Sequence, residues 1–175
     1  MIRLRSPLFS SLAAVLALAG CDTAALDRKV TSLETSSYDY RDTRKLVNAV
    51  KKASLLVEGQ GPDAFDTFRK RPDIWNEELY NLYVYTLDGT CLYHPERPDF
   101  IGRNLLDVTD SQGRKALRHV MAAVNDANNP HGWVHYVWQP HLGLHPVEKS
   151  SSNFKVTMPD GQAVVVGGGI TKPLE

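Results

Sequence analysis

The strongest constraint on the fold is a β-hairpin signal near the middle of the chain. Residues 81–87 alternate aromatic and aliphatic side chains, and Asp88 and Gly89 follow them directly. Asp-Gly between two such runs is among the strongest short turn signals, since a tight hairpin needs residues that tolerate positive φ. Residues 90–94 then read as the returning strand, which Pro95 stops. The chain therefore contains antiparallel β-structure.

Two helical segments precede this hairpin. From Asp42 onwards the apolar residues Leu46, Val50, Ala53 and Val57 share one face at helical spacing, which predicts a long amphipathic helix. Glycines at 59 and 61 and a proline at 62 end it, and a shorter helix is predicted over residues 63–70, before Pro72 interrupts the chain.

The segment after the hairpin predicts one more helix and three more strands. The helix runs from about residue 114 to 127, and the strands cover about 133–139, 149–156 and 162–167, with a Pro-Asp-Gly turn between the last two. Helices, a hairpin, a helix and then strands form an α+β order with about five antiparallel strands. We expect one domain over residues 42–172, on a polar tether over residues 21–41.

The first twenty residues have the pattern of an export signal. Arg3 and Arg5 precede an apolar run over residues 8–18, which is shorter than the roughly 20 residues of a membrane-spanning helix. Ala19 and Gly20 before Cys21 resemble the bacterial lipobox, in which the cysteine is lipidated after cleavage of residues 1–20. An ordinary secretory signal with a coincidental cysteine is the alternative.

The residue after the cysteine bears on localisation. Asp22 resembles the signal that keeps enterobacterial lipoproteins in the inner membrane, so we expect a lipid anchor on the extracytoplasmic face of that membrane. Several acyl chains on one residue would make the attachment stable. The whole chain has 20 basic and 20 acidic residues and no basic stripe, which argues against a nucleic-acid partner. Cys91, in an apolar strand pattern, is expected to be a buried, inert thiol.

Several blocks of the sequence, taken together and in order, resemble single Cache domains over roughly residues 42–172. The blocks are LYVYTLDGT (82–90) with His94 and Pro95, IGRNLLD (101–107), DSQG (110–113), GWVHYVWQP (132–140), KSS (149–151) and VGGGI (166–170). The resemblance implies a PAS-like antiparallel sheet carrying a long N-terminal helix.

The resemblance also implies a function. Such domains lie outside the cytoplasm and bind small molecules, often short carboxylates, and in this family the long helix often mediates homodimers. The sequence has no apolar segment after the domain, so we expect any signal to pass through a membrane partner. The alternatives are an interaction module that binds no ligand and a metal-binding protein that uses the histidines.

Alternation along the strands sorts the candidate binding residues, because successive strand side chains point to opposite faces. By resemblance, Tyr136 and Trp138 line the pocket, with plain core packing as the alternative. Lys149 and Ser151 would bind a carboxylate, although an isolated lysine is more often a solvated surface charge. His94 is a candidate ligand contact or a capping residue, and Tyr83 a candidate pocket residue or a core residue.

Neither a metal site nor an active site is predicted. His131, His135, His141 and His145 are evenly spaced, but the first pair enters a strand, where four steps span roughly 13 Å. Prolines at 140 and 146 exclude a helix across most of the second pair. The chain has no nucleophile elbow, P-loop or zinc-protease motif, and we predict no cofactor. Glycines 167–169 are read as backbone that passes close to its neighbours.

Overall fold

The computed structural model describes residues 38, 40–76, 80–138 and 145–171. The export signal over residues 1–20, the lipidation at Cys21, Asp22 and His141 therefore lie outside the described residues. The elements in chain order are α2 (Arg41–Gln60), α3 (Asp63–Lys70), α4 (Pro72–Trp75), β1 (Asn81–Thr86), β2 (Cys91–Tyr93), the 3-10 helix η1 (Pro98–Phe100), α5 (Ala116–Ala123), β3 (Val134–Trp138), β4 (Val147–Thr157) and β5 (Ala163–Thr171).

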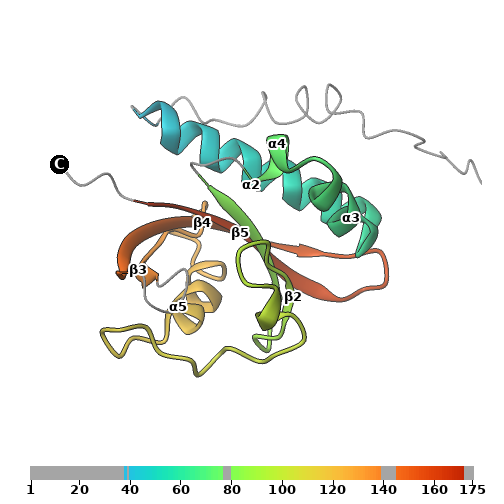
Figure 1. Ribbon diagram of the computed structural model, residues 1–175. Coiled ribbons are helices and arrows are strands. Elements are labelled where there is room, and N and C mark those ends of the chain that lie inside the picture. The colour runs from blue at the N-terminus through green and yellow to red at the C-terminus, as the bar shows by residue number, and fades with distance from the viewer. Residues whose placement is uncertain (1–37, 39, 77–79, 139–144, 172–175) are drawn as a thin grey trace, which may run out of the picture.

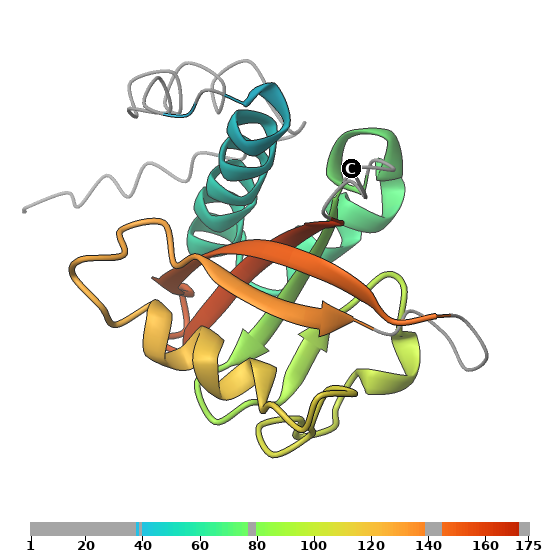
Figure 2. The same cartoon turned by 90° about the vertical axis from the view of Figure 1, so that its left-hand side faces the viewer.

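The five strands form one antiparallel sheet in the order β2-β1-β5-β4-β3. The last strand of the chain thus lies at the centre of the sheet, between the first hairpin and β4. Helix α2 crosses one face of the sheet, and α5 lies on the other face (Figure 1, Figure 2). This arrangement confirms the expected α+β, PAS-like architecture with a long N-terminal helix.

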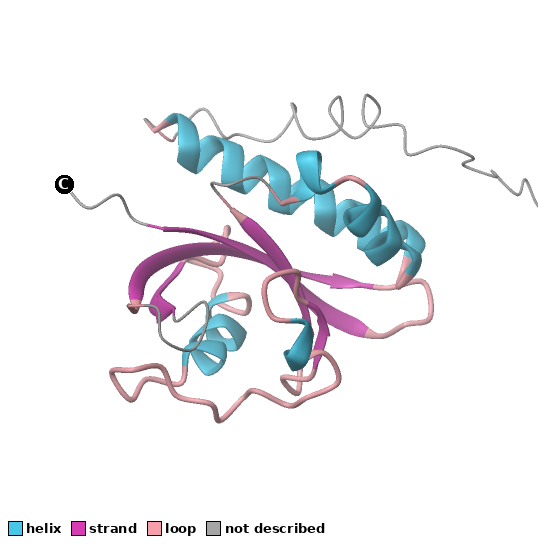
Figure 3. Cartoon of the chain, viewed as in Figure 1, coloured by secondary structure: helices cyan, strands magenta, loops and turns pink. Residues whose placement is uncertain are grey.

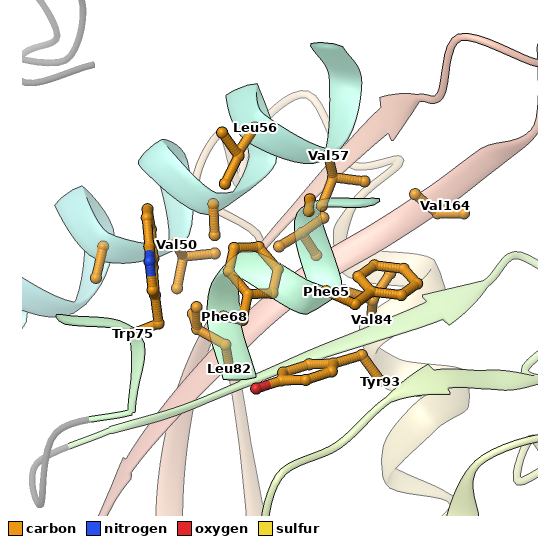
Figure 4. Packing of buried hydrophobic residues seen from close by; sticks show 14 of the residues in the cluster. Val50, Leu56, Val57, Phe65, Phe68, Trp75, Leu82, Val84, Tyr93 and Val164 are labelled. Atoms are coloured by element: carbon orange, nitrogen blue, oxygen red, sulfur yellow. The ribbon is translucent and has the colours of Figure 1, made fainter. Parts of the chain in front are cut away.

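The face under α2 holds the larger hydrophobic core. The apolar stripe predicted from the sequence is confirmed, because Leu46, Val50, Ala53 and Val57 are all fully buried. From the sheet, Leu82 and the other side chains of the same parity pack against this stripe. The aromatic rings of α3, α4 and β2 lie alongside it (Figure 4). The alternation along β1 explains this packing, since every second side chain points to α2.

The opposite face carries a second, smaller cluster. Tyr83 and Tyr85, of the other parity in β1, pack with Val165 and with Leu117 and Val120 of α5. A long loop between β2 and α5 runs beneath this face of the sheet (Figure 3). No helix among the described residues has both the length and the apolar character needed to cross a membrane.

Two element boundaries differ from the sequence prediction for identifiable reasons. Helix α5 is shorter than the predicted 114–127, because the N–H of Arg114 donates to the Asp110 carboxylate and the Asn125 side chain donates to the Met121 carbonyl. Strand β5 continues through the glycines to Thr171, because Gly167, Gly168 and Gly169 stay paired with both β1 and β4.

Candidate functional site

A hollow of about 210 Å³ lies on the sheet face that carries α5. This volume suits a small metabolite. Val108 lines the hollow and is 51% exposed, so the hollow reaches solvent on the side of the long loop. Strands β1 and β3, helix α5 and the loop supply the walls: Tyr83, Tyr85, His94, Arg97, Phe100, Leu105, Val108, Thr109, Asp110, Ser111, Ala116, Leu117, Val120, Tyr136, Val137 and Trp138.

Aromatic rings form one wall of the hollow. The imidazole of His94 lies between the rings of Tyr83 and Trp138, nearly parallel to both, with centroid distances of 6.2 and 5.3 Å. Phe100 meets both His94 and Trp138 edge-on. Residues from β1, β3 and the segment after β2 thus build a single flat-sided surface against which the apolar part of a ligand can pack.

The protonation of His94 follows from its surroundings. Burial, together with the nearby Lys149 and Arg97 cations, lowers the pKa of His94 to about 4. Its Nδ1 accepts a hydrogen bond of 3.2 Å from the backbone N–H of Arg97. A neutral imidazole has one acceptor and one donor nitrogen, so Nε2 carries the proton and is the donor. His94 is therefore a neutral hydrogen-bond donor in the wall of the hollow.

A buried polar chain runs beside the aromatic wall. The Tyr83 hydroxyl donates to Oδ1 of Asn153 over 2.7 Å, and the Asn153 amide donates to the Gly132 carbonyl and to the Ser151 hydroxyl. Burial raises the pKa of Tyr83 to about 12, and it also raises that of Tyr136. Both phenols are therefore protonated at neutral pH and keep an O–H group for hydrogen bonding.

The glycines of β5 make room for these side chains. A Cβ on Gly167 would lie 2.2 Å from Asn153 Oδ1 and 2.4 Å from the Tyr83 ring, and one on Gly169 would lie 2.9 Å from the Tyr136 hydroxyl. On the other face, a Cβ on Gly168 would meet Val50 of α2 at 2.9 Å. The prediction that these glycines allow close approach is thus confirmed.

Arg97 is the cation that lines the hollow. Its guanidinium carbon lies 3.8 Å from the centre of the Phe100 ring, and its Nε and Nη2 donate to the two carboxylate oxygens of Asp99. These bonds use two of the five N–H donors of the side chain. The stacking on Phe100 and the pairing with Asp99 hold the guanidinium in place and leave donors for a further anion.

The predicted residues of β4 lie behind this wall. Lys149 and Ser151 point to the same face as the hollow, yet neither is among the described residues that line it. Lys149 is buried, 5.4 Å from the centre of the Trp138 ring and 3.6 Å from the Glu96 carboxylate. Ser151 lies deeper, where its hydroxyl accepts from Asn153. Of the six predicted residues, the structure gathers four around the hollow: Tyr83, His94, Tyr136 and Trp138.

Asp110 fastens the loop that forms the floor of the hollow. Its side chain is 3% exposed, and its two oxygens accept hydrogen bonds from the backbone N–H groups of Gln112, Arg114 and Val137 and from the Arg114 side chain. Burial opposes ionisation, but these bonds outweigh it and lower the pKa of Asp110. The bond to Val137 ties the loop to the edge strand β3.

Of the histidines that the structure describes, His94 alone lines the hollow. His131 is hydrogen-bonded to the Tyr38 hydroxyl, and exposed His135 is bonded to Ser150. Tyr38 also accepts from Trp133 over 2.8 Å, so the end of the segment expected to be a tether packs on the domain. Among the residues with described placement, no three His, Cys, Asp or Glu side chains come together as metal ligands would.

Sequence reasoning missed three residues of the site, namely Arg97, Asp110 and Asn153. Arg97 and Asp110 lie in loops, whose side-chain directions no periodicity fixes. Asn153 has a signal, because it shares strand parity with Lys149 and Ser151, and a buried amide opposite a glycine-rich strand needs partners.

The comparison with family models decides the assignment. The family model for single Cache domain 2 matches residues 33–171. The chain belongs to this family. Cache domains are ligand-binding and signalling modules that lie outside the cytoplasm. Extracytoplasmic ligand sensing is therefore the general function of this domain. No curated protein matches the chain in sequence.

Solved structures of chemotaxis and chemosensory proteins are similar to this Cache domain. A Cache chemosensory domain described for carboxylic acid recognition shares 17% identity at a TM-score of 0.58, with 88% of this chain and all of the other covered. The periplasmic sensor domain of a chemotaxis protein shares 20% sequence identity at a TM-score of 0.55, again with 88% of this chain and all of the other covered. A methyl-accepting chemotaxis protein from Vibrio parahaemolyticus RIMD 2210633 shares 16% sequence identity at a TM-score of 0.54, with 84% of this chain and 96% of the other covered. At these identities the likeness concerns the fold.

Proposed function

We propose that this Cache domain senses a small carboxylate that binds in the hollow beside α5. The observation that carries the proposal is the combination of a metabolite-sized hollow, an aromatic wall and the cation of Arg97 among the lining residues. An apolar pocket with a few fixed polar groups is the usual form of a small-molecule site. The ligand would also accept hydrogen bonds from the neutral imidazole of His94 and from the phenol of Tyr136, which line the same hollow as Arg97.

The remaining polar groups favour an anion over a cation as the ligand. Asp110, the one carboxylate among the described lining residues, already accepts hydrogen bonds on both oxygens from the loop and β3. Arg97, in contrast, retains N–H donors beyond its two bonds to Asp99. A carboxylate would meet this excess of donors in charge-assisted hydrogen bonds. The carboxylic acid recognition described for a protein of the same fold supports this choice of ligand.

Titration calorimetry of the purified domain with acetate, propionate and larger monocarboxylates tests the proposal. We expect saturable binding that the Arg97→Gln variant weakens about tenfold or more, since a charge-assisted bond is replaced by a neutral one. Arg103→Gln is the matched control, because Arg103 lies on the same segment but does not line the hollow. Absence of binding by any carboxylate, or equal losses in both variants, would contradict the proposal.

We further propose that the domain is anchored by lipid on Cys21 and reports to a signalling protein in the same membrane. The order of Arg3, the apolar run and Ala19-Gly20-Cys21 supports export with lipidation, and Asp22 supports retention in the inner membrane. The test is expression of the full chain in a Gram-negative host with labelled fatty acid. Label and membrane association should both be lost in Cys21→Ser. Label retained in that variant would contradict the anchor.

A further inference from the structure

A partly buried ion pair lies beside the aromatic wall. The Lys149 side chain is 9% exposed and the Glu96 side chain 29%. Lys149 Nζ lies 3.6 Å from Oε2 of Glu96, which is longer than a charge-assisted hydrogen bond of about 2.7–2.9 Å. The other oxygen, Oε1, accepts from the amide of Asn81. The carboxylate of Glu96 is thus held at one oxygen and rests against the lysine with the other.

The described part of the chain leaves some polar groups around this pair without a hydrogen-bond partner. Oε2 of Glu96 and Nε1 of Trp138 are both buried, and neither has a hydrogen-bond partner among the described residues. Buried polar atoms without partners are rare in folded proteins and call for a specific explanation, such as a bound molecule. Burial lowers the pKa of Lys149, and Glu96 only partly offsets this effect. Glu96 therefore only partly compensates the charge of Lys149.

The pair borders the proposed ligand site on several sides. Tyr136 lies directly opposite Lys149 in the β3–β4 register, and both side chains lie over Gly169. Trp138 lines the hollow, and Lys149 Nζ lies 5.4 Å from the centre of its ring. Glu96 belongs to the short segment between His94 and Arg97, and both of these neighbours line the hollow.

From this geometry we infer that Glu96 is an affinity- and specificity-determining residue, an internal carboxylate that competes with the ligand carboxylate for Lys149. A buried ammonium needs a counter-anion, and Glu96 supplies one when the site is empty. A bound carboxylate that reaches Lys149 takes the position of Glu96 Oε2. Only ligands whose contacts with the hollow outweigh the loss of the Glu96 pair then bind well. This inference rests on the proposed function.

The test is the Glu96→Gln variant, titrated with propionate and with its uncharged analogue propionamide. Glutamine keeps an acceptor for Asn81 and removes the competing charge, so we expect propionate to bind about tenfold more tightly than to the wild type. Propionamide should show no such gain. Glu148→Gln is the matched control, because it removes one negative charge from the residue before Lys149 on an exposed position of β4. It should leave propionate affinity within about twofold.

A second variant covers the case in which Glu96→Gln does not fold. Glu96→Asp keeps the charge but shortens the side chain by one methylene, which draws the carboxylate away from Lys149, so propionate affinity should also rise. Unchanged or weaker affinity for propionate in the folded Glu96 variants, with clear binding by the wild type, would overturn the inference and leave the proposed function intact. No carboxylate binding by the wild type or any folded variant would instead overturn the proposed function.

Discussion

Tyr83 and Asn153 are joined by a 2.7 Å hydrogen bond that passes over the central strand of the sheet. The two residues lie in one cross-strand row with Gly167 between them, since Gly167 is the register partner of both. The missing side chain at the centre of this row allows two side chains from non-adjacent strands to meet. This bond links β1 to β4 on the face that carries the hollow.

The first prediction concerns that row. Gly167→Ala places a Cβ 2.2 Å from Asn153 Oδ1, so we expect a loss of about 1–3 kcal/mol in the free energy of unfolding from overpacking. Urea unfolding followed by circular dichroism measures it. Gly59→Ala in α2 is the control, because nothing lies within 4 Å of its added Cβ, and alanine favours a helix. A Gly167→Ala protein as stable as the wild type would contradict the close packing.

The second prediction isolates the bond itself. Tyr83→Phe removes the donor and leaves the buried Asn153 Oδ1 without it, so we expect a loss of about 1–2 kcal/mol in unfolding free energy. A double-mutant cycle with Asn153→Ala, measured by urea unfolding, should give a coupling of about 1 kcal/mol. Asn153 has other partners, so its single variant alone is not diagnostic. Strict additivity of the two variants would show that the bond contributes nothing.

The third prediction is a pH dependence from His94. Its folded pKa of about 4 lies below the ordinary 6.5, so the unfolded chain binds more protons between these values. The contribution of neutral His94 to the free energy of unfolding is fully present above about pH 6.5. It is lost as the pH falls towards 4, and the total loss is about 3 kcal/mol. Unfolding free energies measured at several pH values should depend less steeply on pH in His94→Gln than in the wild type. The exposed His119→Gln serves as the control, and an equal flattening there would contradict the assignment.

The fourth prediction concerns the loop that Asp110 fastens. Asp110→Asn replaces an oxygen that accepts from Arg114 and Val137 by an amide that cannot accept. We expect a loss of about 2 kcal/mol in unfolding free energy and weaker carboxylate binding, because the floor of the hollow loosens. Hydrogen exchange of the loop should rise. Asp107→Asn, whose ion pairs are solvent-exposed, should change little. Slow exchange in Asp110→Asn would contradict the anchoring role.

The sequence alone determined the order of the three longer helices and the five strands and the buried face of the long helix, but not the short helices α4 and η1. The Asp88-Gly89 turn, the stripe of Leu46 and Val50 and the alternation along β1 are local patterns, and local geometry fixes what they mean. The resemblance predicted that Tyr136 and Trp138 share the pocket face of β3, and both line the hollow. The glycines of β5 were recognised as close-approach positions before their neighbours were known.

Only the tertiary structure decided which charged residues meet which side chains. Arg97, which the sequence did not single out, lines the hollow, and Lys149, the predicted carboxylate contact, is paired with Glu96. Arg97 and Glu96 lie in an irregular segment, where no period relates sequence position to direction. The partner of a side chain there depends on contacts between residues about fifty positions apart, and these form only when the whole sheet is assembled.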